Sequence, residues 1–194
     1  MTSQLTPIGL IDALVEEINK IFDGYLYKIP HDPENVTTLD DYSEDGTVSG
    51  QGTDTEAASH DKESDYVKRR PLRVFAQDVP INETGDDFDP APYVIVRLKS
   101  GDDDGSADAV NTVQVIFIIA IWDDDNDSQG FRDVMDIIQK IYIRFHKEPM
   151  LNNQFMYAGQ FHWALQEDNY WPYFFGACNM NFNIPSIRRE NEFA

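Results

Sequence analysis

The sequence has few basic residues and no long apolar segment. Its 194 residues include 15 Lys and Arg against 35 Asp and Glu, which gives a formal net charge of −20. Because proteins that grip nucleic-acid backbones need a basic face, this balance excludes phosphate binding as the main function. The longest apolar run, Val115 to Trp122, has eight residues, whereas a helix that crosses a membrane needs about 20. The sequence therefore predicts no membrane span.

Cysteine is nearly absent, and so are the features of a secretory signal. The one cysteine, Cys178, permits neither an internal disulfide nor a cysteine-based zinc site, and its aromatic surroundings predict a buried, unreactive thiol. The first basic residue is Lys20, and Asp12 interrupts the only apolar stretch before it, so both regions of a signal peptide are missing. We expect a protein that is made and kept, or assembled, in a cytoplasm.

Motifs of enzyme chemistry are missing as well. The chain has no glycine-rich phosphate loop, no nucleophile elbow and no zinc-protease helix motif. Its four histidines, His31, His60, His146 and His162, are far apart and form no metal-ligand spacing. We expect His146 in the last turn of a helix, where the helix dipole favours a basic residue, and His162 in a packed or edge strand. The sequence therefore predicts no enzyme activity, no cofactor and no metal site.

The chain does have enough apolar residues for a core. Hydrophobic residues make up 41% of it, and 12 Phe, 9 Tyr and 3 Trp exclude global disorder. Residues 31–66 differ from the rest, because they hold eleven acidic side chains, one lysine and few large apolar side chains. So little apolar surface cannot offset the entropy of ordering. We predict a single domain over 1–194 with a long, flexible acidic loop inserted at 31–66.

Most of the other acids also lie in segments with the composition of turns. Together with 31–66, the clusters at 78–89, 102–108 and 123–127 contain 24 of the 35 acids. Such runs either keep a protein soluble or act electrostatically on a partner, and the sequence leaves both open. One basic cluster, Lys68, Arg69 and Arg70, directly follows the acidic segment. It could fold back on the acids or meet an acidic partner.

Periodic segments between these clusters predict two helices and two β-hairpins. Thr6 and Pro7 begin a helix, and Gly24 terminates it as the C′ residue. Ser128 caps a second helix, whose apolar stripe runs from Phe131 to Phe145. The predicted strands, rich in β-branched and aromatic residues, are 25–29, 72–79, 93–98, 113–122, 155–165 and 173–184. We predict an α+β fold with a mainly antiparallel sheet and two helices packed on one face.

A partial calcium-loop spacing precedes the second helix. Asp125, Asp127 and Gln129 alternate, Gly130 stands at the sixth position, and Asp136 stands where a bidentate glutamate is expected. Because a strand and not a helix precedes this segment, we favour a polar turn that caps the second helix and places negative charge at its positive end. A calcium-dependent binding module stays open as an alternative.

Several segments between residues 70 and 186 follow one another in a distinctive order. They are Arg70 to Pro80, Pro92 to Arg97, the turn Trp122 to Asp125 after a valine-rich strand, the helix Gly130 to Ile138, and the closing run Trp163 to Pro185. In order and number they resemble the tail terminator proteins of long-tailed bacteriophages. The resemblance covers about residues 70–186 and the first helix loosely, and the acidic insertion at 31–66 departs from the family's compact form.

This resemblance implies a structural virion protein at the head-proximal end of the tail. Members of the family form a ring, typically of six copies, which stops polymerisation of the tail tube and presents a surface to the head connector. The implied partners are other copies of the chain, the tail tube protein and the head connector or stopper protein. The nearest alternative is another head-to-tail joining or minor tail protein.

DNA would pass through such a ring without specific binding. Carboxylates that face a channel repel a duplex. We therefore expect the acidic hairpin tip at Asp102, Asp103 and Asp104, or the loop at 31–66, to line or fringe the channel. The basic residues Lys68, Arg69 and Arg70 are the other candidates for an interface.

Overall fold

The structure is a computed structural model, and it describes residues 5–30, 69–80, 91–103, 111–125 and 129–185. Its elements are α1 (Pro7–Ile21), β1 (Leu26–Lys28), β2 (Arg69–Pro71), β3 (Arg73–Ala76), β4 (Tyr93–Asp102), β5 (Asn111–Trp122), α2 (Gln129–Lys147), β6 (Met150–Leu151), β7 (Phe155–Leu165) and β8 (Tyr173–Ile184). The predicted acidic loop at 31–66 lies outside the described residues.

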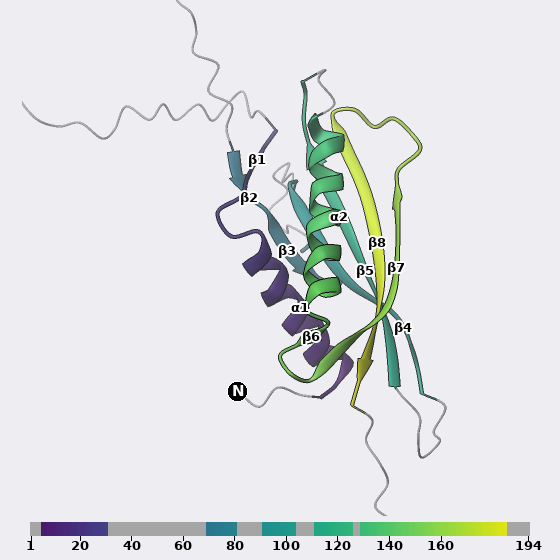
Figure 1. Ribbon diagram of the computed structural model, residues 1–194. Coiled ribbons are helices and arrows are strands. Elements are labelled where there is room, and N and C mark those ends of the chain that lie inside the picture. Colours follow the sequence, from purple (N-terminus) through teal and green to yellow (C-terminus); the bar gives the residue numbers. More distant parts are fainter. Residues whose placement is uncertain (1–4, 31–68, 81–90, 104–110, 126–128, 186–194) are drawn as a thin grey trace, which may run out of the picture.

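Six strands form one sheet in the order β3-β4-β5-β8-β7-β6, and α1 and α2 lie on the same face of it (Figure 1). The two hairpins, β4–β5 and β7–β8, stand side by side because β5 pairs with β8 over its whole length. Neighbouring strands are antiparallel except β3 and β4, which are parallel. The predicted α+β fold with a mainly antiparallel sheet is confirmed.

The core lies between the helices and the middle of the sheet. Alternate residues of β5, including Val115, Phe117 and Ile119, are fully buried, as the two-residue period of a strand requires. On α2 the residues from Val134 to Phe145 that recur at helical spacing are buried in the same cluster. The predicted apolar stripe is confirmed except at its beginning, because Phe131 remains 46% exposed.

Local signals set the beginning of α1. The Thr6 hydroxyl accepts a hydrogen bond from the Gly9 amide at 3.2 Å, and Pro7 is the first helical residue. The helix ends at Ile21 with Phe22 as its C-cap, so Gly24 stands one residue beyond the C′ position predicted for it. Gly24 has a φ of +79° and turns the chain into β1, a conformation that side chains with a Cβ disfavour.

The sequence did not predict β6, which pairs locally with the beginning of β7, nor a short pairing between two distant segments. β1 and β2 form a separate two-stranded sheet, in which Lys28 lies opposite Arg69. β2 contains two arginines and a proline, which are not typical strand residues. Its conformation is therefore set by pairing with a strand about 40 positions earlier in the chain, which no local pattern reports.

Candidate functional site

The charged residues predicted as a site lie at opposite ends of the sheet. Asp102 is the last residue of β4, and it and Asp103 are exposed. Arg69 lies in β2, just before β3, and β3 pairs with the other end of β4. Since β4 has ten residues, its ends are about 30 Å apart. The acidic tip and the basic cluster therefore do not meet.

The basic cluster is divided between the surface and the interior. The guanidinium of Arg70 donates a hydrogen bond to the carbonyl oxygen of Ala91, and its side chain is half-buried. Arg69 is exposed in β2. Arg70 thus joins two segments of the fold, while Arg69 is available to a partner. The remaining predicted candidates, Lys68 and Asp104, lie outside the described residues.

A buried carboxylate stands at the beginning of α2. Asp123, directly after β5, is 1% exposed and accepts a hydrogen bond from the Gly130 amide at 2.7 Å. Its other oxygen accepts one from the Lys28 ammonium at 2.6 Å. The predicted capping role of this acidic turn is confirmed, because a carboxylate satisfies an amide in the first turn and faces the positive end of the helix dipole. The predicted cap, Ser128, lies outside the described residues.

Lys28 occupies the centre of this acidic turn. The carboxylate oxygens of Asp123, Asp124 and Asp125 lie within 4.8 Å of one another, and the Lys28 ammonium binds both Asp123 and Asp125. Burial alone would lower the pKa of Lys28, but its bonds to the two carboxylates raise it. A fixed ammonium therefore balances the charge that a bound cation would otherwise balance.

From Gln129 onward, the residues of the partial calcium-loop spacing are helical. Gly130 is the second residue of α2, and Asp136 lies further along the same helix, where it pairs with Lys140. In a calcium loop the glycine makes a sharp turn and the last acid points at the ion. The segment from Gln129 onward therefore folds as part of α2 and not as that loop.

The cysteine and the two described histidines lie as predicted. Cys178 is buried, and burial raises its pKa to about 12, so the thiol stays protonated and unreactive. His146 is in the last turn of α2 and stacks on Tyr142, with ring centroids 5.1 Å apart. His162 is exposed on β7.

The outer side of β7 is an open sheet edge. β6 pairs only with Phe155 and Met156, so among the described residues no strand covers β7 beyond Met156. Figure 1 shows β7 as the outer strand, with its turn to β8 at the upper end. Between Tyr157 and Phe161 a bulge interrupts its pairing with β8, and Gly159 adopts a φ of +83° there. Long open edges invite pairing with another chain unless charge or proline protects them.

A groove of about 520 Å³ runs between β7 and α2. We call it the α2–β7 groove; it is lined by Met135, Ile138, Gln139, Tyr142, His146, Tyr157, Gly159, Phe161 and Trp163. Tyr142 and Phe161, which both line it, pack against each other with ring centroids 4.8 Å apart. Trp163 remains 53% exposed. The walls are thus aromatic and carry amide, hydroxyl and imidazole groups but no carboxylate.

Charge is almost absent along this whole side of the chain. Residues 149–166 and 169–187 contain no Asp, Glu, Lys or Arg, and only Glu167 and Asp168 separate the two stretches. Yet most of the residues from 158 to 171 are exposed. In a chain of which 26% is charged, an exposed surface without charge resembles the centre of a protein interface, where charged residues are depleted.

The turn between β7 and β8 presents two exposed aromatic residues. Tyr170 and Trp171, which we call the aromatic tip, are 56% and 54% exposed. The Trp171 amide donates to the Asn169 side-chain oxygen at 3.0 Å, and the Tyr173 amide donates to the Tyr170 carbonyl oxygen at 2.8 Å. The tip is therefore held in one conformation by hydrogen bonds within the turn.

The sequence prediction did not include the groove or the tip. Clusters of charged residues stand out in the sequence. The groove and the tip differ from the rest of the surface because they lack charge on residues that the fold leaves exposed. The uncharged stretches can be read in the sequence, but exposure cannot, because uncharged strands are usually buried. Only the position of β7 at the edge of the sheet identifies the surface.

Comparisons with known proteins identify no relative. A scan against known protein families finds no family that matches the chain, and a search of curated proteins finds no similar sequence. Among the described residues no helix is long and apolar enough to cross a membrane. The class established by the structure is an α+β protein whose sheet has one uncharged, open edge.

Proposed function

We propose that this chain is a structural protein of a phage tail, of the tail terminator kind. Copies of it form a ring, six in the expected form, at the head-proximal end of the tail tube. The ring stops polymerisation of the tube and joins it to the head connector. This function needs surfaces for assembly and no catalytic group.

The observation that carries the proposal is the exposed, uncharged side of β7. The open edge of β7, the α2–β7 groove and the aromatic tip lie on one side of an otherwise acidic protein. An acidic chain of net charge −20 repels its own copies unless they meet through uncharged or complementary surfaces. The order of segments over residues 70–186, which resembles that of tail terminators, supports the position in the tail.

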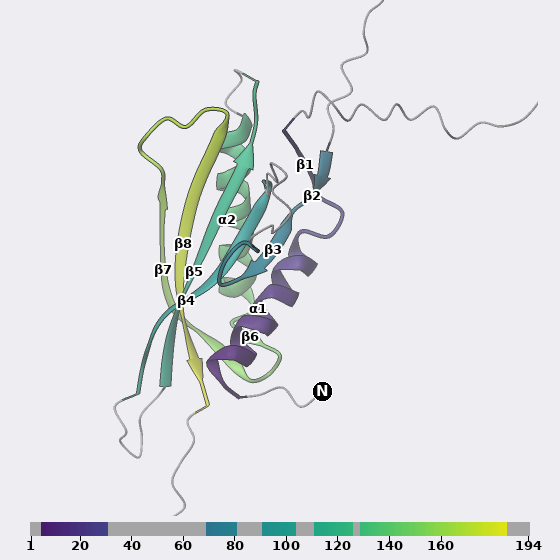
Figure 2. The same cartoon turned by 180° about the vertical axis from the view of Figure 1, so that it is seen from behind.

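The acidic hairpin tip is proposed to face the channel of the ring. Asp102 and Asp103 are exposed at the far end of β4, and this end of the strand lies apart from both helices (Figures 1 and 2). Carboxylates there would keep DNA moving past without adhering. A ring structure with this hairpin on the outer rim would contradict the channel role and leave the ring itself standing.

Electron microscopy of assembled tails tests the function. Tails are assembled from purified components with the protein, without it, and with a folded control protein of similar charge in its place. We expect tubes of uniform length that accept heads only when the protein is present, and overlong or headless tails otherwise. Uniform, head-competent tails in its absence would overturn the proposal.

The nearest alternative is another head-to-tail joining or minor tail protein, which the same uncharged surface would serve. Native mass spectrometry of the protein mixed with purified tail-tube subunit separates the two. A terminator binds the end of a tube as a ring, whereas a protein from another position forms a complex of different copy number or none. The calcium-dependent alternative has less support, because Lys28 is bound between Asp123 and Asp125.

A further inference from the structure

We propose that the aromatic tip of one copy docks in the α2–β7 groove of the next copy. This inference rests on the proposed ring and adds which two surfaces meet. The occupant of the groove is thus a second copy of this chain, and the residues that enter it are Tyr170 and Trp171.

The tip has the properties of an interface anchor. Both aromatic side chains are more than half exposed, although tryptophan and tyrosine gain most from burial at interfaces. The turn is already ordered by the hydrogen bonds to Asn169 and between Tyr173 and Tyr170. Docking therefore costs little conformational entropy beyond that of the two side chains.

The groove has the complementary properties. Its volume of about 520 Å³ lies within the range of roughly 300–1,000 Å³ typical of occupied binding sites. Tyr142, Phe161 and Trp163 offer ring faces and edges to an incoming aromatic residue. The bulge at Gly159 separates the middle of β7 from β8 on this side, and the edge of β7 beside it can pair with backbone of the incoming turn.

The tip of a copy cannot fill that copy's own groove. Tyr170 of the tip lines a separate hollow together with Phe131, at the N-terminal end of α2. Tyr142, in the groove, lies eleven residues further along the helix, which is about 16 Å. Because hydrogen bonds hold the turn in place, the tip has to reach the groove of another molecule.

Charge complementarity selects a second copy as the occupant. Glu167 and Asp168 precede the tip in the same turn and are exposed. At the other end of the groove His146 lines its wall and Lys147 follows, both exposed in the last turn of α2. Docking brings two carboxylates toward the Lys147 ammonium and the His146 imidazole in a protein that is otherwise strongly acidic, which favours this approach over others.

A contact between two different surfaces of identical chains is head-to-tail. Such contacts close into a ring when the rotation per copy allows it and continue as a filament when it does not. The contact therefore accounts for a ring without any two-fold symmetric interface. It also predicts that each copy uses both its aromatic tip and its α2–β7 groove, and that a mutation can disable either surface without affecting the other.

Mixing of two defective variants tests the contact. The tip variant carries Tyr170→Ala and Trp171→Ala, and the groove variant carries Trp163→Glu, which places a charge in the uncharged aromatic wall of the groove. Ile8→Ala is the matched control, because Ile8 is 64% exposed on α1, away from both surfaces. Native mass spectrometry of the full chain measures the number of copies, and thermal melting verifies folding.

Wild type and Ile8→Ala are expected to form the same closed complex. Each defective variant alone is expected to associate at least about 30-fold more weakly, as for loss of an interface hot spot. Their equimolar mixture is expected to form a complex of one copy each and nothing larger, because one intact tip meets one intact groove. If Trp163→Glu melts early, Trp163→Ala replaces it.

Three outcomes overturn the inference. Rings that form unchanged from either variant would show that copies meet elsewhere, while the proposed ring survives. A mixture with no two-copy complex would show that the tip and groove are not partners. Wild-type protein that stays monomeric at all concentrations would exclude the contact in solution, and the tail microscopy then decides the proposed function separately.

Discussion

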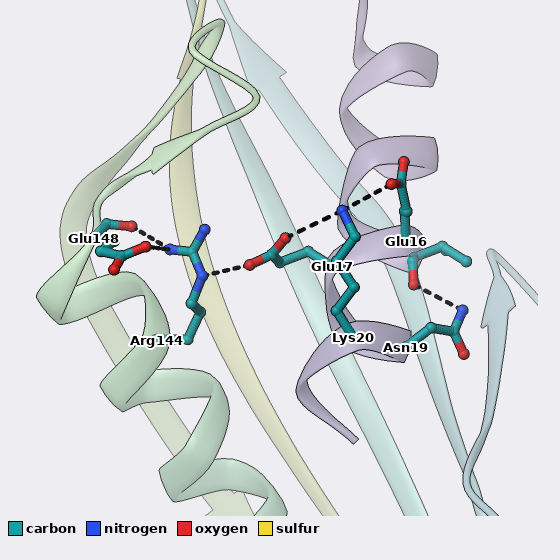
Figure 3. A network of polar contacts seen from close by, with 7 residues as sticks. Glu16, Glu17, Asn19, Lys20, Arg144 and Glu148 are labelled. Atoms are coloured by element: carbon teal, nitrogen blue, oxygen red, sulfur yellow. Dashed lines mark hydrogen bonds and ion pairs between the residues drawn. The ribbon is translucent and has the colours of Figure 1, made fainter. Parts of the chain in front are cut away.

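The two sides of α2 differ in chemistry and in what covers them. The side toward α1 and β1 is ionic and closed: Arg144 pairs with Glu17 of α1 and is hydrogen-bonded to the Glu148 carbonyl (Figure 3). The side toward β7 is uncharged and open, because Met135, Gln139, Tyr142 and His146 face the α2–β7 groove.

This difference shows how one helix can serve both the fold and the assembly. Ion pairs that are only 13–20% exposed, such as Glu17 with Arg144, fix the helix against its neighbour with defined geometry. An uncharged aromatic wall loses little when water is removed, so it suits a surface that is covered later. We infer that the stability of the chain depends on the ionic side and its association on the uncharged side.

Among changes to the charged residues, Asp123→Ala is expected to have the largest effect on stability. It removes the main partner of Lys28, whose side chain is 14% exposed, and leaves the Gly130 amide without its acceptor. We expect a loss of about 3 kcal/mol in the free energy of unfolding, because Lys28 keeps only the exposed Asp125 as a partner and the buried Gly130 amide loses its acceptor. Urea unfolding measures it, with Asp124→Ala, at an exposed neighbour, as control. A loss below about 1 kcal/mol would contradict the inference that the stability of the chain depends on its ionic side.

A double-mutant cycle of Glu17→Ala and Arg144→Ala measures the energy of the ion pair that joins α1 to α2. We expect a coupling energy of about 1 kcal/mol, because both side chains are mostly buried. The matched cycle uses Glu16 and Lys20 on the same helix, which are 63% and 58% exposed and should couple by at most about 0.5 kcal/mol. Equal coupling energies in the two cycles would mean that burial does not strengthen the ion pair between Glu17 and Arg144.

Asp133→Asn is expected to have a smaller effect of opposite sign. Burial raises the pKa of Asp133, and the charges of Asp123 and Asp136 raise it further, against a hydrogen bond from Gln129. The folded state then binds this proton more tightly than the unfolded state, so stability falls as the pH rises from about 3.8 through the raised value. The asparagine variant should lose this decline and be more stable than wild type at pH 7.

The effect of Asp133 on stability is measured as the unfolding midpoint at a series of pH values between 3 and 7. Asp12→Asn, at an exposed position of α1, is the control and should run parallel to wild type. Parallel curves for wild type and Asp133→Asn would show that this carboxyl group does not oppose folding.

Trp163→Ala is expected to change stability least, although it removes the largest kind of side chain. Trp163 is 53% exposed, and we expect a change within about 0.5 kcal/mol. Phe145→Ala, on the closed side of the core and fully buried, should cost about 3–5 kcal/mol in the same unfolding assay. A loss above about 1.5 kcal/mol for Trp163→Ala would mean that the groove is part of the core of the single chain.

The accuracy of the sequence prediction followed the range of the interactions. The last two strands, 155–165 and 173–184, agree with β7 and β8 residue by residue, because alternation and turn residues lie within each segment. The cap at Thr6 was equally local. β2 and the parallel pairing of β3 with β4 were missed, because both depend on strands far along the chain.

The candidate site shows the same limit. Charged residues were chosen from the sequence, yet Arg70 is hydrogen-bonded to Ala91 within the fold, and Asp102 and Arg69 lie at opposite ends of the sheet. The capping role of the acidic turn before α2 was predicted, since helix beginnings need carboxylates. Its ammonium partner was not, because Lys28 is 95 positions from Asp123.

The sequence by itself determined the charge, the apolar periods and therefore the elements and the α+β class. It also determined that residues 149–166 carry no charge. Only the tertiary structure decided that β7 stands at the edge of the sheet, with Trp163 in the open and Lys28 beside Asp123. Periodicity is a property of neighbours in the chain, whereas exposure and ion pairing depend on which distant segments the sheet brings together.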